Sequence, residues 1–271
     1  MKSLTKIIIL AAILAGLAAP SYAESIVIEG STTVLPIAQR AAEEFMNKDS
    51  AADISVRGGG SGVGIASLIA KTCDIADASR AMKDQELEQA VARGVDPVAN
   101  VVAMDGIAMV VNSSNPIDAL TKQQVKDIFT GKISYWSELG GANEPIVVVS
   151  RDSASGTFES FGELAMDKQK VRKDALMEAS NGAVASTIAR TPNAIGYVGL
   201  GFISTSGLKP LALNGVMPSK KTVLSKKYAL SRPLFMYTNG KPQGLVKDFL
   251  DFVLSKEGQA LVGEEGYVEL N

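Results

Sequence analysis

Short apolar strands in this sequence repeatedly end in a loop of glycine, serine and threonine that leads directly into an amphipathic segment. Three such joints lie at residues 30–33, 58–62 and 151–157. After the second joint, Ile65 and Leu68 fall three positions apart, which places them on one face of a helix. Strands that alternate with helices in this way predict an α/β protein.

The predicted elements follow the same alternation along the chain. Thr121 and Gln124 have the spacing of a capping box, which predicts a helix start at this point. The C-terminal segment, residues 245–255, has an apolar helical face. Strands are predicted at residues 25–28, 53–57, 73–79, 107–111, 145–151, 193–202 and 233–237.

Each strand–loop–helix joint provides a place where an anion can bind. The first turn of a helix leaves backbone N–H groups without partners, and the helix dipole adds about half a positive charge there. The loop at residues 58–62 resembles a nucleotide phosphate loop, but it continues Gly64-Ile65 instead of Gly-Lys-Ser. Considered alone, this loop is better explained as a helix cap, so its interpretation as an anion site depends on the other joints.

The third joint adds a positive charge. Arg151 closes the apolar strand at residues 145–151, and Ser155, Gly156 and Thr157 open the next helix. A guanidinium beside free amides and two hydroxyls is a strong group for binding an oxyanion. The three joints together therefore predict an anion site.

The N-terminus predicts export. Lys2 and Lys6 precede an apolar stretch at residues 7–19, which is followed by the small residues Ser21 and Ala23. This is the pattern of a cleavable signal peptide at residues 1–23, and we expect a periplasmic protein. No cysteine lies at the cleavage site, so no lipid anchor is expected. Cys73 is the only cysteine, and we interpret it as a small buried side chain.

The composition excludes several functions. The chain has no histidine, which removes Ser-His-Asp and Cys-His catalysis and every histidine metal site. An exported hydrolase using Ser61 or Ser155 is the alternative from another class, but neither serine has a histidine to activate it. With 27 basic and 29 acidic residues and no basic tract, nucleic acid is not an expected partner. We predict a non-enzyme without metal or cofactor.

The order and spacing of the three joints, together with "DGIAMVVN", "IFTGKISYWSELGG" and "AIGYVGLGF", resemble the periplasmic phosphate-binding proteins of ABC transporters. The resemblance covers essentially the whole mature chain and is greatest to the shorter branch, whose first loop reads Gly-Ser-Thr-Thr. It implies a type II-like clamshell of two α/β lobes joined by crossing strands. The implied division is residues 24–108 plus 233–271 for lobe 1 and residues 109–232 for lobe 2.

The resemblance also implies the residues of the site. The first and second loops contribute donors from lobe 1, and the third contributes a clamp arginine and a run of donors from lobe 2. Matched position by position, the predicted phosphate-binding residues are Thr32, Thr33, Ser61, Arg151, Ser155, Gly156 and Thr157. Three further residues are possible contributors: Ser31, Ser79 and Arg80.

The sequence departs from the family pattern at two positions. Ser79, followed by Arg80, stands where studied members have the aspartate that accepts the proton of bound phosphate. Ser153 stands where members often have a second aspartate. The alternative acceptors are Ser79 itself, Asp77, Asp105 and Asp152, and Arg80 either adds positive charge or pairs with a neighbouring acid.

The expected function is therefore capture of inorganic phosphate and its delivery to inner-membrane ABC permease subunits by a monomeric, non-catalytic protein. Because the usual acceptor is missing, a protein of the same fold that binds sulfate, molybdate or tungstate is an alternative. An anion-sensing module for a membrane receptor is a further alternative.

Overall fold

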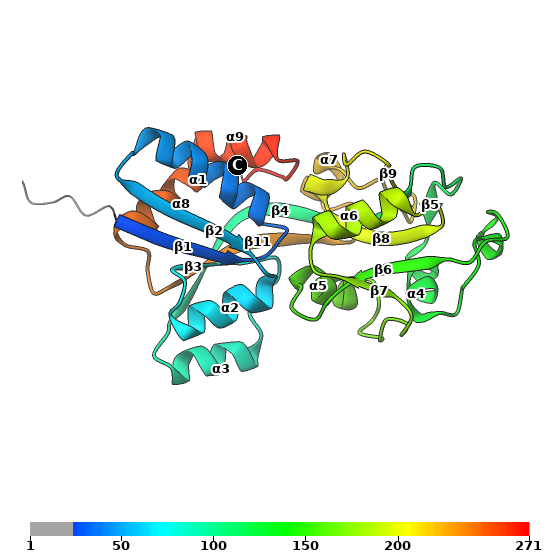
Figure 1. Cartoon of the computed structure of the whole chain (residues 1–271), viewed down its shortest axis with the longest axis horizontal. Coiled ribbons are helices and arrows are strands. Elements are labelled where there is room, and N and C mark those ends of the chain that lie inside the picture. Colours follow the sequence, from blue (N-terminus) through cyan, green and yellow to red (C-terminus); the bar gives the residue numbers. More distant parts are fainter. Residues whose placement is uncertain (1–23, 271) are drawn as a thin grey trace, which may run out of the picture.

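The computed structural model describes residues 24–270, and the predicted signal peptide lies outside them. Figure 1 shows two α/β lobes side by side, connected by two long strands. These strands are β4 (Pro97–Asn112) and β11 (Ser231–Asn239), which pair with each other in antiparallel register. The predicted α/β fold with two lobes joined by crossing strands is confirmed.

One sheet passes through both lobes within the described part of the chain. Its order is β2-β1-β3-β11-β4-β8-β6-β7, and β9 also pairs with β4. Strand β4 changes partner from β11 to β8 between Gly106 and Ile107, where the chain passes from one lobe to the other. The remaining strands of this sheet are β1 (Glu24–Gly30), β2 (Ala52–Gly58), β3 (Ile75–Ala78), β6 (Val147–Arg151), β7 (Leu176–Glu178), β8 (Ala194–Gly199) and β9 (Leu208–Pro210).

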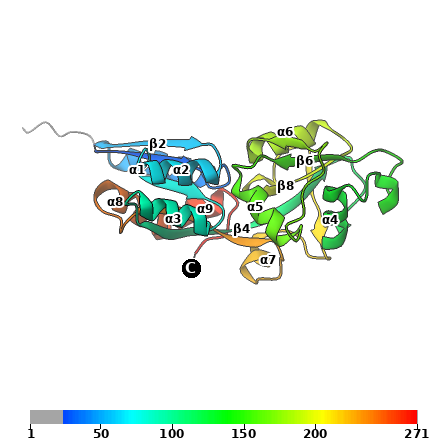
Figure 2. The same ribbon diagram turned by 90° about the horizontal axis from the view of Figure 1, so that it is seen from below.

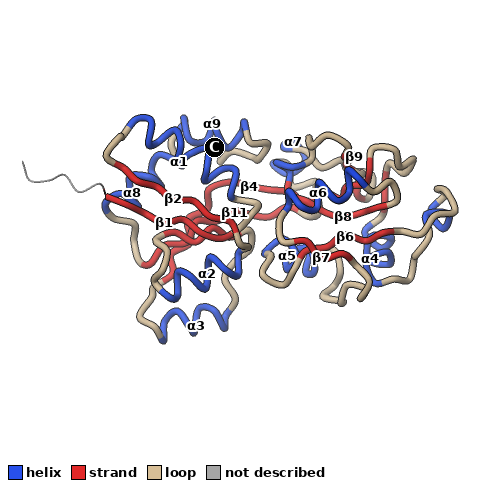
Figure 3. The backbone as a smooth tube through the Cα atoms, in the orientation of Figure 1, coloured by secondary structure: helices blue, strands red, loops and turns tan. Residues whose placement is uncertain are grey.

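Helices cover the sheet on both sides in each lobe (Figures 2 and 3). Lobe 1 carries α1 (Leu35–Lys48), α2 (Ser61–Ala70), α3 (Asp84–Ala92), α8 (Gly244–Leu254) and α9 (Lys256–Glu264). Lobe 2 carries α4 (Lys122–Thr130), α5 (Gly156–Leu164), α6 (Asn181–Arg190), α7 (Lys220–Leu224) and the 3-10 turns at Trp136–Leu139 and Leu200–Phe202. A small separate sheet pairs β5 (Ala119–Leu120) with β10 (Ala212–Leu213).

Each lobe has its own apolar core. In lobe 1, Ile28, Val34 and Phe249 are fully buried between the sheet and the helices. In lobe 2, the rings of Phe161 and Tyr197 stack with centroids 4.0 Å apart. Cys73 is buried in lobe 1 as predicted, and burial raises the pKa of its thiol to about 12. Separate cores allow the lobes to act as rigid units around the strands that join them.

Local sequence explains most element ends. The predicted capping box is present at α4: Thr121 Oγ1 accepts from the N–H of Gln124, and the Gln124 side chain accepts from the N–H of Thr121. The strand predicted over residues 193–202 is shorter than expected and ends at Gly199. The reason is that the N–H of Leu200 donates to the Asp105 carboxylate, 2.9 Å away, and not to a neighbouring strand.

The ends of β2 in lobe 1 and β6 in lobe 2 bring the two lobes into direct contact. The N–H of Gly62 donates to the carbonyl oxygen of Ala154 in the opposite lobe, at 2.9 Å. Gly60 has a φ of +99°, and a Cβ there would lie 2.6 Å from the same carbonyl oxygen. Glycine is required at this position both by its backbone conformation and by the close approach of the lobes. The lobes therefore lie closed against each other.

Candidate anion site between the lobes

The predicted site residues of both lobes meet where the lobes touch. Thr33 Oγ1, from the turn before α1, lies 2.9 Å from Thr157 Oγ1 in the first turn of α5. Thr32 Oγ1 accepts from Arg151 Nη2 at 3.2 Å. Ser61 and Ser155 are also buried, at the starts of α2 and α5. Residues separated by about 120 positions in the sequence thus form one polar cluster.

Arg151 is the charged centre of this cluster. It is 1% exposed, and its Nε and Nη2 donate to the carbonyl oxygens of Glu178 and Ala179, each at 3.0 Å. Its Nη1 is buried and has no hydrogen-bond acceptor among residues 24–270. Burial lowers the pKa of Arg151, but a guanidinium stays protonated in proteins. A buried cation hydrogen-bonded to carbonyls and a hydroxyl still needs an anion.

Helix starts add further donors. The N–H groups of Gly156 and Thr157, in the first turn of α5, have no carbonyl partner within the helix. Ser155 caps the same helix by accepting from the N–H of Phe158 at 3.2 Å, which leaves its hydroxyl hydrogen available. Ser61 begins α2, so a second helix dipole also points its positive end here. Both helices present donors and partial positive charge.

Asn181 belongs to the cluster but was not predicted from the sequence. It is fully buried at the start of α6, and its Nδ2 donates to Thr33 Oγ1 at 2.9 Å and to Thr32 Oγ1 at 3.2 Å. Its Oδ1 accepts from the N–H of Gly199. Ser180 caps α6, so "SNG" is a fourth helix start rich in small polar residues. That local pattern is the signal by which Asn181 could have been found.

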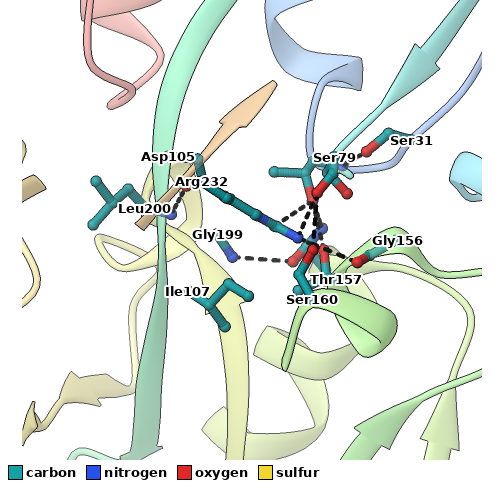
Figure 4. A network of polar contacts seen from close by, with 12 residues as sticks. Ser31, Ser79, Asp105, Ile107, Gly156, Thr157, Ser160, Gly199, Leu200 and Arg232 are labelled. Atoms are coloured by element: carbon teal, nitrogen blue, oxygen red, sulfur yellow. Dashed lines mark hydrogen bonds and ion pairs between the residues drawn. The ribbon is translucent and has the colours of Figure 1, made fainter. Parts of the chain in front are cut away.

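Arg232 is the second residue that the sequence predictions missed. Figure 4 shows it extending from β11 between Asp105 and the Thr157 segment. It pairs with Asp105, with Nη2 2.9 Å and Nε 3.0 Å from Oδ2. Complete burial raises the pKa of Asp105, and the adjacent guanidinium opposes that effect. Arg232 lies just before the apolar run 233–237, where nothing local distinguishes it from a solvent-exposed arginine.

The three possible contributors differ in their surroundings. Ser31 Oγ accepts from the N–H groups of Thr33 and Val34 and so caps the first loop. Ser79 is buried, with its hydroxyl 3.3 Å from that of Ser61.

Arg80 pairs with neighbouring acids, the second of the two alternatives left open. Its Nη groups lie 2.7 Å from both oxygens of Glu86, and its Nε lies 2.6 Å from Glu159 in the other lobe. Lys83 joins the same cluster, which we call the rim cluster (Arg80, Lys83, Glu86 and Glu159), through Glu159 at 2.8 Å. The charge of Arg80 is therefore balanced within the protein.

The candidate carboxylate acceptors are either occupied or isolated. Asp105 accepts from Arg232 and from the N–H of Leu200, and Asp152 accepts from the N–H of Ala154 at 3.0 Å. Asp77 is fully buried on β3, and neither of its oxygens has a partner among the described residues. Burial raises the pKa of Asp77 well above its usual range.

Residues 24–270 lack two further features. No group of three or more histidine, cysteine, aspartate or glutamate side chains is arranged to hold a metal ion. No helix in this range has the length and apolar character needed to cross a membrane.

Two lobes closed over a buried cluster of donors define a solute-binding protein of the clamshell class. A model of the PBP superfamily domain matches residues 17–257. The phosphate-binding protein PstS of Bacillus subtilis is 34% identical over 248 residues, which cover 90% of this chain and 80% of that protein. PstS of Borreliella burgdorferi is 32% identical, over 89% of this chain and 88% of its own.

A solved structure gives the same result. A putative phosphate ABC transporter substrate-binding protein from Clostridium perfringens, with bound phosphate, is 34% identical and superposes with a TM-score of 0.84, covering 92% of this chain and all of that one. The chain belongs to the PstS-like phosphate-binding proteins of the PBP superfamily.

Proposed function

We propose that this protein captures inorganic phosphate between its lobes and delivers it to the permease of an ABC importer, without catalysing a reaction. The observation that carries the proposal is the buried Nη1 of Arg151, which has no acceptor within residues 24–270 and is surrounded by donor groups. A desolvated cation of this kind is stabilised when an anion occupies the site.

The other proposed ligand-binding groups suit a tetrahedral oxyanion. The lobe 1 donors are the hydroxyls of Thr32, Thr33 and Ser61, and the lobe 2 donors are Ser155, Gly156 and Thr157. They come from both lobes, so an anion held among them can receive hydrogen bonds from either lobe. The B. subtilis relative is a phosphate-binding protein and the C. perfringens structure holds bound phosphate, which supports phosphate as that anion.

A second candidate ligand is another tetrahedral oxyanion such as sulfate, molybdate or tungstate. The observation that favours it is the occupation of Asp105 and Asp152 by protein donors, because phosphate near neutral pH carries a proton that needs an acceptor. Sulfate carries none. A site built on hydrogen bonds can discriminate between such ligands by roughly four to five orders of magnitude.

The remaining parts of the proposal concern the whole protein. We propose export to the periplasm through the signal peptide at residues 1–23, release without a lipid anchor, and action as a monomer. The division into residues 24–108 plus 233–271 and residues 109–232 stays a prediction. A sensing role would use the same anion site and differ only in the membrane partner.

The test is isothermal titration of the mature protein, stripped of bound anion, against phosphate and then sulfate across pH 5–8.5. Tight phosphate binding without sulfate heat is the expected result, and it means that a group in the site accepts the proton of phosphate. If sulfate binds as tightly as phosphate, the assignment of phosphate as the ligand is wrong, but the assignment of the anion site is unaffected. Binding of neither anion would reject the site.

A further inference from the structure

Arg232 is buried where the two lobes meet, close to the residues of the anion site. It lies directly opposite Asp105 in the pairing of β11 with β4, the two strands that join the lobes. Arg232 is 4% exposed and Asp105 is fully buried. Their contact at 2.9 Å balances the charge of the guanidinium inside the protein. Arg232 therefore adds little net charge to the anion site.

The N–H groups of Arg232 are all used by the protein. Besides Asp105, Nη1 donates to the carbonyl oxygen of Ser79 at 3.0 Å and to that of Gly156 at 3.4 Å, and Nη2 donates to Thr157 Oγ1 at 2.9 Å. A guanidinium has five N–H donors, and these contacts together with those to Asp105 account for all five. No donor is left for a ligand.

These contacts reach both lobes at once (Figure 4). Ser79 belongs to lobe 1, whereas Gly156 and Thr157 belong to lobe 2. A side chain on a joining strand can satisfy both sets only when the lobes are closed. Separating the lobes would break the hydrogen bonds of Arg232 to at least one lobe, and each of them would have to be replaced by a hydrogen bond to water.

The same contacts restrict the directions that the threonine hydroxyl hydrogens can take. Thr157 Oγ1 accepts from Arg232, and Thr33 Oγ1 accepts from Asn181 Nδ2 at 2.9 Å. The two hydroxyl oxygens lie 2.9 Å apart, so one hydroxyl hydrogen joins them. The other hydrogen cannot point back at these donors, so it is available for donation to a bound anion.

We infer that Arg232, held by Asp105, is a positioning residue for anion binding: it stabilises the closed lobes and orients the Thr157 hydroxyl without contacting the anion. This inference rests on the proposed function. It is distinct from a direct electrostatic role, which would require an unbalanced charge.

Two variants of the mature chain separate positioning from charge. Arg232→Lys keeps the positive charge but has a single amine, which cannot reach Asp105, Ser79, Gly156 and Thr157 together. Positioning predicts about 10- to 100-fold weaker phosphate binding, with most of the change in the release rate. Asp105→Asn keeps the side-chain shape and removes the balancing charge. Positioning predicts weaker binding here as well, whereas a direct charge effect predicts tighter binding.

The measurements are phosphate affinity by calorimetry, release rate by stopped flow, and closure on adding phosphate by small-angle scattering. Arg172→Lys is the matched control, because Arg172 is also paired with an aspartate, Asp174, but lies within lobe 2. Thermal unfolding checks that each variant is folded. If Arg232→Lys does not fold, the phosphate affinity of Asp105→Asn tests the inference by itself.

The outcomes distinguish this inference from the proposed function. Unchanged affinity and release in Arg232→Lys, or tighter binding in Asp105→Asn, would overturn the inference while leaving phosphate binding intact. If the wild-type chain binds sulfate instead, the same variants are compared with sulfate. A wild-type chain that binds neither anion would overturn both.

Discussion

The ends of two strands in opposite lobes each carry a buried ionisable side chain without a full set of protein partners. At the end of β6, Arg151 Nη1 has no acceptor, and on β3 neither oxygen of Asp77 has a donor, within the described residues. Their surroundings differ: Arg151 lies among hydroxyls and the helix starts of α5 and α6, whereas Asp77 is fully buried on β3, and burial raises its pKa.

The difference shows how a buried ionisable group can become a ligand site. An aspartate removes its own charge by binding a proton, so burial alone makes it neutral. An arginine cannot lose its proton, so its charge must be met by another group. Asp77 therefore requires no ligand, whereas Arg151 requires an anion from solution.

The largest expected effect is that of Arg151→Ala. Removing one partner of a buried charge pair costs about 2–5 kcal/mol, which is roughly a 30-fold to several-thousand-fold loss of affinity. Calorimetry with phosphate measures this loss, and circular dichroism checks the fold. Unchanged affinity would contradict the assignment of Arg151 and remove the contrast with Asp77.

The next effect concerns Asp77 and the pH dependence of stability. Because the pKa of Asp77 is raised in the folded protein, the unfolded chain releases its proton first, near pH 4, as the pH increases. Above that pH the folded state binds more protons, so the free energy of unfolding decreases by up to about 1.4 kcal/mol per pH unit until the folded pKa is reached. Asp77→Asn is expected to remove this contribution.

Urea unfolding of wild type and Asp77→Asn between pH 4 and 8 measures the effect. The difference in free energy between the variant and wild type should increase with pH in favour of the variant. Asp53→Asn, at an exposed site on β2, is the matched control. A constant difference for Asp77→Asn would mean that Asp77 is charged and that a partner for it exists.

The smallest expected effect is at the rim cluster, where the protein itself balances an arginine. Glu159 is 18% exposed and contacts Arg80 and Lys83 from the opposite lobe. Partly exposed ion pairs contribute about 0.2–1 kcal/mol, so Glu159→Gln should release phosphate about 1.5- to 5-fold faster. Stopped-flow release at low and high salt measures this.

High salt should reduce the difference between Glu159→Gln and wild type, because partly exposed charges are screened. Glu163→Gln, on the same helix but pointing to Lys168 within lobe 2, is the control and should release at the wild-type rate. If Glu159→Gln lost as much phosphate affinity as Arg151→Ala, the rim cluster, and not Arg151 alone, would hold the anion.

Local patterns in the sequence predicted much of the architecture. The alternation of strands with hydroxyl-rich helix starts predicted the α/β fold, and the capping box at Thr121 predicted the start of α4. These features depend on residues within a few positions of each other, whose conformations are coupled through caps and first-turn amides. For the same reason, Thr32, Ser61, Arg151 and Ser155 could be proposed as anion-binding residues from the sequence.

Tertiary structure decided the partners of the charged groups. Arg232 and Asp105 are 127 positions apart and meet only because β11 and β4 pair. The contact of Arg80 with Glu159 requires the two lobes to close on each other. A sequence shows where the charged residues are, but not which of them are buried next to each other. Between the closed lobes, the distance from each arginine to the nearest carboxylate determines whether the protein balances its charge or an anion must do so.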